Sequence, residues 1–197
     1  DSGSFILTVI PVNDAPVVDA IADQTVAEDT SLTLTLSASD VDGDDVTFSA
    51  SADNGSATVD GTTLTVTPSA DYNGIVAVEV IVTDGSLQSN VAFELIVNPV
   101  NDAPFLFVYG DGSIDEDTEL AVEIYNEFSS SAYDVDGDDL TFTVSIDDNG
   151  LASIDGSTLT IIPATNYIGD ILVTLTVSDG SLTDSGSFTL TVTPVND

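Results

Sequence analysis

The sequence predicts an all-β protein made of two tandem Greek-key β-sandwiches, with about seven strands in each. Apolar residues alternate with other residues at a period of two, which is typical of half-buried strands. A Pro-Val-Asn-Asp motif recurs along the chain, and clusters of Gly, Asp and Asn separate the apolar runs. No stretch shows the 3.6-residue period and the caps of a helix.

The recurring motif divides the chain into repeats. Pro-Val-Asn-Asp-Ala-Pro occupies residues 11–16 and 99–104, and Pro-Val-Asn-Asp occupies residues 194–197. The spacing is 88 positions from Asn13 to Asn101 and 95 from Asn101 to Asn196. Because this is an ordinary domain length, we predict one repeat over residues 11–100 and another over residues 101–197. The second repeat has a six-residue insertion between its strands B and C.

The first ten residues belong to neither sandwich. Residues 1–14 match residues 184–197 at 12 of 14 positions, whereas they match residues 89–102 at only 7. We therefore predict that residues 1–10 are the last strand of a preceding repeat of the second kind.

Several alternating runs mark the core strands. They are Leu32, Leu34 and Leu36; Val76, Val78, Val80 and Val82; Phe93, Leu95 and Val97; Ile171, Val173, Leu175 and Val177; and Phe188, Leu190 and Val192. Asp60-Gly61 and Asp155-Gly156 are predicted as two-residue hairpin loops. Tyr72 and Tyr167 are predicted to place their rings in the corner between strands E and F and to form hydrogen bonds with the backbone through their hydroxyls.

The composition excludes several classes of function. The chain has 35 acidic residues and no Lys, Arg or His, which gives a net charge of -35. Such a chain cannot neutralise phosphate, so nucleic acid is excluded as a partner. The chain has no His, Cys or Lys for nucleophilic or general-base work. Two carboxylates could in principle hydrolyse a glycoside, but nothing marks a cleft with aromatic subsites, so we expect no enzyme. No apolar run reaches transmembrane length, and we expect no direct membrane insertion.

The acidic residues are concentrated in loops. In a seven-stranded sandwich, with strands labelled A to G, the A–B and E–F loops lie at one pole, and the B–C and F–G loops lie at the other with the incoming linker. End-to-end stacking would bring one repeat's A–B and E–F loops against the next repeat's linker, B–C and F–G loops. The joint complete in this sequence would gather Glu28, Asp29, Asp71, Asn101, Asp102, Asp134, Asp136, Asp138 and Asp179.

Carboxylates and amide oxygens gathered in this way favour calcium, which takes 6–8 oxygen ligands in tolerant geometry. The full candidate set is Asn13, Asp14, Glu28, Asp29, Asp40, Asp42, Asp44, Asp71, Asp84, Asn101, Asp102, Glu116, Asp117, Asp134, Asp136, Asp138, Asp179, Asn196 and Asp197. Each loop taken alone is equally an ordinary acidic turn. An EF-hand is excluded, because the glycine comes too early and no Glu stands at the twelfth position.

These motifs resemble the tandem cadherin-like repeats, of the tandem-95 and VCBS type, in large secreted bacterial adhesins. The matching sequence motifs are Pro-Val-Asn-Asp-Ala-Pro, Glu-Asp-Thr, Asp-Val-Asp-Gly-Asp-Asp, Asp-Tyr-Asn-Gly and Thr-Asp-Gly. The resemblance implies cadherin-like or immunoglobulin-like sandwiches and calcium that rigidifies each joint. It assigns ligand roles to Glu28, Asp134, Asp136, Asp179, Asn101 and Asp102. One departure is that Asp71 is replaced in the second repeat by Thr165-Asn166, which leaves the number of ions per joint open.

The resemblance also implies an extracellular protein, secreted or on the cell surface, that serves adhesion or biofilm formation as a stalk whose partners are adjacent repeats. Two alternatives remain. Residues 1–10 could join other copies of the chain into a filament by strand pairing. The insertion, with Tyr125, Phe128 and Tyr133, could contact a partner or bind glycans in a calcium-dependent manner, or could simply lengthen strand B.

Overall fold

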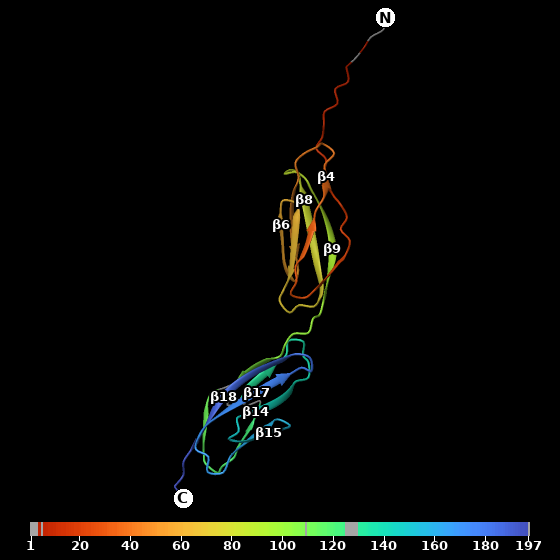
Figure 1. Ribbon diagram of the computed structural model, residues 1–197. Helices are drawn as coiled ribbons and strands as arrows, with labels where there is room; N and C mark the ends of the chain where they lie inside the picture. Colours follow the sequence, from red (N-terminus) through yellow and green to blue (C-terminus); the bar gives the residue numbers. More distant parts are fainter. Residues whose placement is uncertain (1–3, 5, 109, 125–129, 197) are drawn as a thin grey trace. The chain divides into compact units, whose positions relative to one another are not determined.

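The computed structural model describes residues 4, 6–108, 110–124 and 130–196. These residues form strands, turns and loops without any helix, so the predicted all-β class is confirmed (Figure 1). None of the described segments is a helix long and apolar enough to cross a membrane. The chain divides into two compact units, unit 1 over Asp1–Val100 and unit 2 over Asn101–Asp197.

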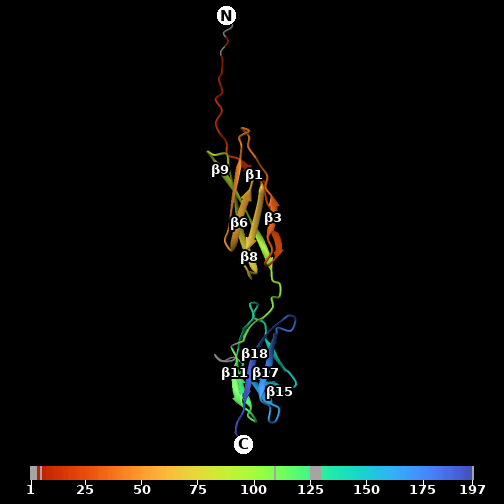
Figure 2. The same cartoon turned by 60° about the vertical axis from the view of Figure 1, so that its left-hand side comes forward.

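Unit 1 is a sandwich of two main sheets and a short strand pair. Its strands are β1 (Val17–Val18), β2 (Gln24–Ala27), β3 (Leu32–Thr35), β4 (Ala38–Ser39), β5 (Thr47–Ala52), β6 (Gly55–Asp60), β7 (Thr63–Pro68), β8 (Gly74–Thr83) and β9 (Gln88–Asn98). One sheet has the order β2-β9-β8-β5 and the other β3-β7-β6, while β1 pairs with β4 (Figure 2).

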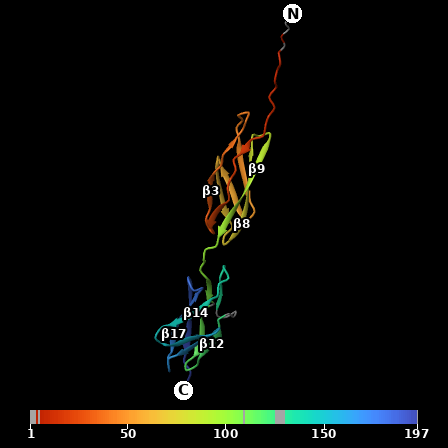
Figure 3. The same ribbon diagram turned by 90° about the vertical axis from the view of Figure 1, so that its right-hand side faces the viewer.

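Unit 2 repeats this topology strand for strand. Its strands are β10 (Phe105–Val108), β11 (Gly112–Asp115), β12 (Leu120–Glu123), β13 (Ser130–Tyr133), β14 (Thr141–Ile146), β15 (Gly150–Asp155), β16 (Thr158–Pro163), β17 (Gly169–Ser178) and β18 (Thr183–Thr193). Its sheets have the orders β11-β18-β17-β14 and β12-β16-β15, with β10 paired to β13 (Figure 3).

The long central hairpins carry the core of each unit. In β8, Val76, Val78, Val80 and Val82 are at most 1% exposed. In β17, Ile171, Val173, Leu175 and Val177 are completely buried. The alternation read from the sequence therefore identifies the inward face of both hairpins correctly, because successive side chains of a strand point to opposite faces.

The predicted strand A is divided into β1 and β2 in unit 1 and into β10 and β11 in unit 2, and strand B is divided into β3 and β4 and into β12 and β13. The described part of each unit therefore contains nine strands instead of about seven. In unit 1, β1 pairs antiparallel with β4, whereas β2 pairs in parallel with β9 at the edge of the larger sheet. The chain thus changes sheets between Val18 and Gln24. Alternation alone does not show this change, because both pieces keep a period of two.

The loops of the two short hairpins lie one residue later in the sequence than predicted. Asp60 still pairs with Thr63 and Asp155 with Thr158, so the loops are Gly61-Thr62 and Gly156-Ser157. Only the glycine of each loop has positive φ, 59° and 60°. This arrangement, with Gly first, is typical of a type II′ turn rather than the Asp-Gly type I′ loop.

The tyrosines at the E–F corners form hydrogen bonds with the backbone, as expected. The hydroxyl of Tyr72 donates to the carbonyl of Ile75 at 2.8 Å, and that of Tyr167 donates to the carbonyl of Asp170 at 2.8 Å. Both rings pack against the core of their own unit.

Two segments fall outside the regular sandwich. Residues 4 and 6–16 take no strand; residues 6–10 extend away from the sandwich of unit 1 (Figure 1), whereas Asn13 and Asp14 are hydrogen-bonded to it. The prediction that residues 1–10 complete a preceding repeat stays a prediction. The insertion of unit 2 includes residues 125–129, which lie outside the described residues. Next to it, β13 has four residues where its counterpart β4 has two.

Candidate metal centres

The loop between β13 and β14 folds around the carboxylate of Asp134. Its Oδ1 accepts hydrogen bonds from the backbone N–H groups of Asp136 at 2.9 Å and Asp138 at 3.4 Å. Gly137 has a φ of 80°, which closes the turn. These bonds form because an Asp side chain can accept from the backbone two residues ahead, and they fix the Asp134 carboxylate in the loop.

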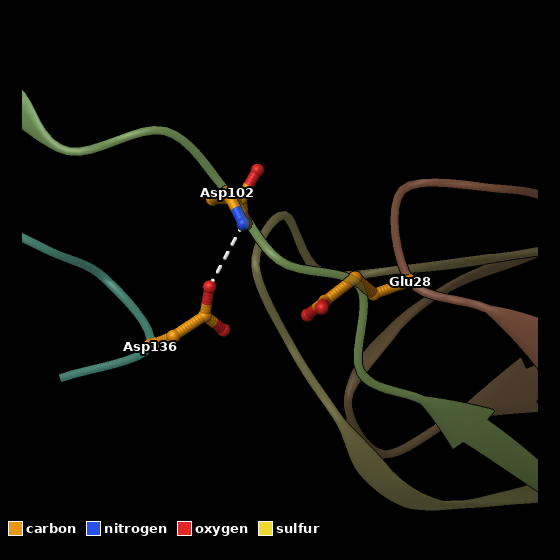
Figure 4. Close-up of side chains that lie close together, drawn as sticks. All are labelled: Glu28, Asp102 and Asp136. Atoms are coloured by element: carbon orange, nitrogen blue, oxygen red, sulfur yellow. Dashed lines mark hydrogen bonds between the residues drawn. The ribbon is translucent and has the colours of Figure 1, made fainter. Parts of the chain in front are cut away.

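The first residues of unit 2 are tied to this loop. The amide Nδ2 of Asn101 donates to Asp179 Oδ2 at 2.8 Å. The backbone N–H of Asp102 donates to Asp136 Oδ2 at 2.8 Å (Figure 4). One carboxylate oxygen of Asp102 and one of Asp136 lie within 4.8 Å of each other. Residues from three separate loops therefore meet at what we call the N-terminal pole of unit 2.

Unit 1 builds the same N-terminal pole from equivalent residues. Asn13 Nδ2 donates to Asp84 Oδ2 at 2.8 Å, and the N–H of Asp14 donates to Asp42 Oδ2 at 2.8 Å. Asp40 Oδ1 accepts from the N–H groups of Asp42 at 2.9 Å, Gly43 at 3.1 Å and Asp44 at 3.3 Å. The arrangement is thus a property of the repeat.

Each N-terminal pole contains a carboxylate oxygen that is buried without a hydrogen-bond partner among the described residues. These oxygens are Asp40 Oδ2 and Asp134 Oδ2. A buried charged oxygen of this kind is costly unless a donor or a cation compensates it. Because the chain has no Lys, Arg or His, any such cation must come from outside.

The opposite end of unit 1 presents a third such oxygen. Glu28, in the turn between β2 and β3, is only 3% exposed. Its Oε1 accepts from the N–H of Val100, and its own N–H donates to Asn98 O at 2.9 Å. Its Oε2 is buried and has no hydrogen-bond partner in the described part of the chain. In unit 2, Glu116 Oε1 holds Val195 N–H at 2.9 Å in the same way.

Asp29 and Asp71 complete this C-terminal pole of unit 1. Their φ angles are 57° and 54°, a conformation that Asp tolerates better than most residues. The N–H of Asp71 donates to Asp29 Oδ1 at 3.2 Å, and one carboxylate oxygen of each lies within 4.8 Å of the other. In unit 2, Asn166 takes the place of Asp71 and donates to Asp117 Oδ1 at 3.0 Å, so this pole carries one charge fewer.

The candidate residues therefore fall into two groups in each unit. The strand β9 begins just after Asp84 and ends just before Val100, and its eleven residues span about 35 Å, so the two poles of unit 1 are far apart. At the N-terminal poles, Asp44 and Asp138 contribute backbone N–H groups. At the end of the chain, Asn196 is exposed, and Asp197 lies outside the described residues.

The aspartates of the β8–β9 and β17–β18 turns accept an unusual number of hydrogen bonds. The N–H of Leu182, the side chain of Asn101 and the N–H of Ser181 hold the pKa of the Asp179 carboxyl below its ordinary value of 3.8. The same three kinds of donor, from Leu87, Asn13 and Ser86, lower the pKa of Asp84. Hydrogen bonds to the ionised form favour that form, so both groups remain available as anionic ligands in mild acid.

This predicts a measurable titration. In the absence of calcium, the side-chain carboxyl carbon of Asp179 is expected to titrate by NMR with a midpoint below 3.8. Because its pKa is lower in the folded than in the unfolded protein, the ionised group stabilises the fold above the unfolded pKa. That contribution is lost as the pH falls through the folded pKa. Asn101→Ala should raise the midpoint of Asp179 and leave that of Asp84, in unit 1, unchanged; equal shifts at both would contradict this account.

The insertion of unit 2 adjoins an exposed aromatic pair. The rings of Tyr133 and Phe105 lie 5.4 Å apart at 38°, and the residues are 62% and 49% exposed. Phe107, on the same face of β10, is 48% exposed. Of the predicted contact residues, Tyr125 and Phe128 lie outside the described residues, and contact of Tyr133 with a partner or glycan stays a prediction. Sequence reasoning missed Phe105 and Phe107. The signal in the sequence was a pair of aromatic residues two positions apart, at places where unit 1 has Val17 and Asp19.

Comparisons with known proteins agree with this architecture. The family described as "Bacterial Ig domain" matches residues 13–94, and the family described as "Cadherin-like domain" matches residues 100–193. A comparison with curated proteins finds no match. Bacterial Ig and cadherin-like domains are typically non-enzymatic and are usually extracellular or exposed at the cell surface.

Among solved structures, human protocadherin-24 EC1-2 has 18% identity and a TM-score of 0.55, with 92% of this chain and 100% of that chain covered. Drosophila N-cadherin EC1-4 has 17% identity and a TM-score of 0.53, with 93% and 50% covered. The endo-fucoidan hydrolase MfFcnA4 from glycoside hydrolase family 107 has 20% identity and a TM-score of 0.41. That match covers 96% of this chain but only 30% of the hydrolase chain. At these identities the cadherins support the fold alone. The two family matches, bacterial Ig over residues 13–94 and cadherin-like over residues 100–193, are consistent with tandem cadherin-like repeats.

Proposed function

We propose that the chain is a section of a stalk in a bacterial extracellular adhesin, and that calcium bound at the joint between the units stiffens it. One ion or more would be held by Glu28, Asp29 and Asp71 of unit 1, by Asn101 and Asp102, and by Asp134, Asp136 and Asp179 of unit 2. The observation that supports this most directly is the pair of buried oxygens at Glu28 and Asp134 that have no hydrogen-bond partner within the described ranges, in a chain without cationic side chains.

Covalent connection supports a shared site without any assumption about how the units are oriented. Glu28 binds the N–H of Val100, and Asp136 binds the N–H of Asp102. Two backbone nitrogens that are two residues apart are separated by at most about 7 Å. The Glu28 and Asp136 carboxylates are therefore each tied to the same short connector, at points two residues apart.

The donor set favours calcium over other metals. All the candidate ligands are oxygens, and calcium accepts 6–8 of them at 2.3–2.6 Å in flexible geometry. Zinc would favour His or Cys, which the chain lacks. Magnesium retains its waters and requires a stricter octahedron, which a set of ligands drawn from several loops satisfies less readily.

The kind of repeat supports the stalk role. Bacterial Ig and cadherin-like domains usually lie outside the cell, and a tandem of them forms a chain of similar modules. A flexible connector would let neighbouring modules swing, and an ion that binds both sides would remove that freedom. A stiff stalk would hold an adhesive tip away from the cell surface, in keeping with a role in adhesion.

The direct test is small-angle X-ray scattering of the two-unit chain with calcium and then with excess chelator. We expect calcium to increase the maximum dimension and to narrow the distribution of interatomic distances, whereas magnesium at equal concentration should do so less. Glu28→Gln should abolish the calcium response. Glu94→Gln, the same change at an exposed site of unit 1, should preserve it. Identical profiles with calcium and with chelator would refute the proposal.

A further inference from the structure

The paired strands β10 and β13 place two aromatic rings on the outside of unit 2. Leu106 is buried in the core, so its neighbours in β10 point to the opposite side. One of these neighbours, Phe105, pairs with Tyr133 of β13, and their ring centroids lie 5.4 Å apart. Both residues are exposed, and so is Phe107 further along β10. We call Phe105 and Tyr133 the aromatic pair.

The sandwich does not need these rings for its own strand pairing. In unit 1 the equivalent strands β1 and β4 pair in the same register with Val17 opposite Ser39. The aromatic pair is therefore an addition that distinguishes unit 2 from unit 1. Adjacent aromatic side chains that are exposed are typical of interaction surfaces. We therefore looked for the kind of partner that this surface fits.

A second copy of the chain fits the surface poorly. A fully covered aromatic side chain buries about 150–250 Å², so three half-exposed rings offer roughly 300 Å², whereas a stable interface takes about 800 Å² from each partner. Two copies would also bring together two chains of net charge -35, with no Lys or Arg on either side. The small area and the like charge both oppose self-association through this face.

Charge favours a cationic partner instead. The face of an aromatic ring attracts an Arg or Lys side chain, and this chain has no cation of its own to place there. Carboxylates also flank the aromatic pair. Asp134 directly follows Tyr133, and Asp184 Oδ2 accepts the N–H of Leu106, the residue after Phe105, at 2.8 Å. Arginine fits best, because its planar guanidinium stacks on rings and is more weakly hydrated than the ammonium of lysine.

We propose that the aromatic pair is a docking site for arginine side chains in a basic segment of a partner protein. Guanidinium groups stack on the rings of Phe105 and Tyr133, and the negative potential of the chain attracts the other basic residues of the segment. The site lies within unit 2, so it does not require the proposed calcium joint. It adds a lateral binding function to the stalk.

The test compares two capped peptides of equal length and charge, one of alternating glycine and arginine and one of alternating glycine and lysine. Calorimetric titrations of the two-unit chain are made with saturating calcium throughout, so that the acidic poles are in the same state in every variant. We expect the arginine peptide to bind more tightly than the lysine peptide. Equal affinities for the two peptides would overturn the proposal, because general electrostatic attraction does not distinguish them.

Unit 1 supplies the matched substitutions. Phe105→Val with Tyr133→Ser gives unit 2 the residues of unit 1 and changes no charge, and it should lower the affinity for the arginine peptide about five- to thirtyfold. Val17→Phe with Ser39→Tyr should create a second site in unit 1, because both positions are exposed. Leu172→Ser removes an exposed apolar side chain of β17 and should leave the affinity unchanged. An unchanged affinity in the first variant, or an equal loss in Leu172→Ser, would contradict the site.

A neutral sugar is the alternative ligand for exposed rings, and NMR distinguishes it. The arginine peptide should shift the ring resonances of Phe105 and Tyr133, whereas maltoheptaose should leave them unchanged. At about 1 M salt, where the Debye length is about 3 Å, binding of the lysine peptide should be lost while the arginine peptide still shifts these resonances. Shifts with maltoheptaose and none with the arginine peptide would overturn the proposal in favour of a glycan.

Discussion

Calcium at about a hundred times its dissociation constant is expected to raise the free energy of unfolding by about 2.7 kcal/mol for each site that only the folded state forms. The increment arises because an ion would compensate the Asp134 oxygen that is buried without a partner among the described residues. It is measured as the difference between urea unfolding curves recorded with calcium and with chelator.

Asp134→Asn tests the assignment of this increment. The amide oxygen can still accept the N–H of Asp136, so the loop should keep its shape, but the negative ligand is lost. We expect most of the calcium increment of unit 2 to disappear, with little change in the presence of chelator. Asp148→Asn makes the same charge change at an exposed turn and should keep the full increment. An unchanged increment in Asp134→Asn would remove this residue from the site.

Leu175→Ala is expected to lower the free energy of unfolding of unit 2 by about 2 to 5 kcal/mol. Leu175 is completely buried in the core of unit 2, so its truncation loses apolar burial and leaves a cavity. Leu172→Ala, three residues away on the same strand, is the matched control, because Leu172 is 55% exposed. Its effect should lie within about 0.5 kcal/mol in urea denaturation. Similar losses at both positions would mean that β17 has been assigned the wrong inward face.

The strands that were easiest to predict are those whose two faces differ most. Val76 to Val82 alternate without interruption, and one residue of slip would expose the whole set, so pattern alone identifies their inward face. The breaks in strands A and B left no such trace. Whether Val18 and Gln24 belong to one sheet or two depends on partners distant in sequence, namely β4 and β9.

The candidate sites were predictable as chemistry but only partly as geometry. The spacing of Asn101, Asp134 and Asp179 indicated oxygen ligands brought together by turns, and the structure ties Asn101 to Asp179 directly. The burial of Glu28 could not be read from the sequence, because an acidic residue in a turn is usually solvated, and its hydrogen bond with the N–H of Val100 joins positions 72 residues apart. The Phe105–Tyr133 pair was missed for a similar reason, since it depends on a cross-strand register.

The parallel pairing of β2 with β9, and of β11 with β18, has a mechanical consequence. In unit 1, the pairs run from Gln24 opposite Leu95 to Ala27 opposite Asn98, so a strand near the start of the unit lies beside the one that ends it. A pull on the two ends of the unit drags parallel neighbours in opposite directions along their length. The hydrogen bonds between these strands are then loaded simultaneously, in shear, instead of breaking one after another. Each module is thereby suited to resist a pulling force applied between its first and last strands.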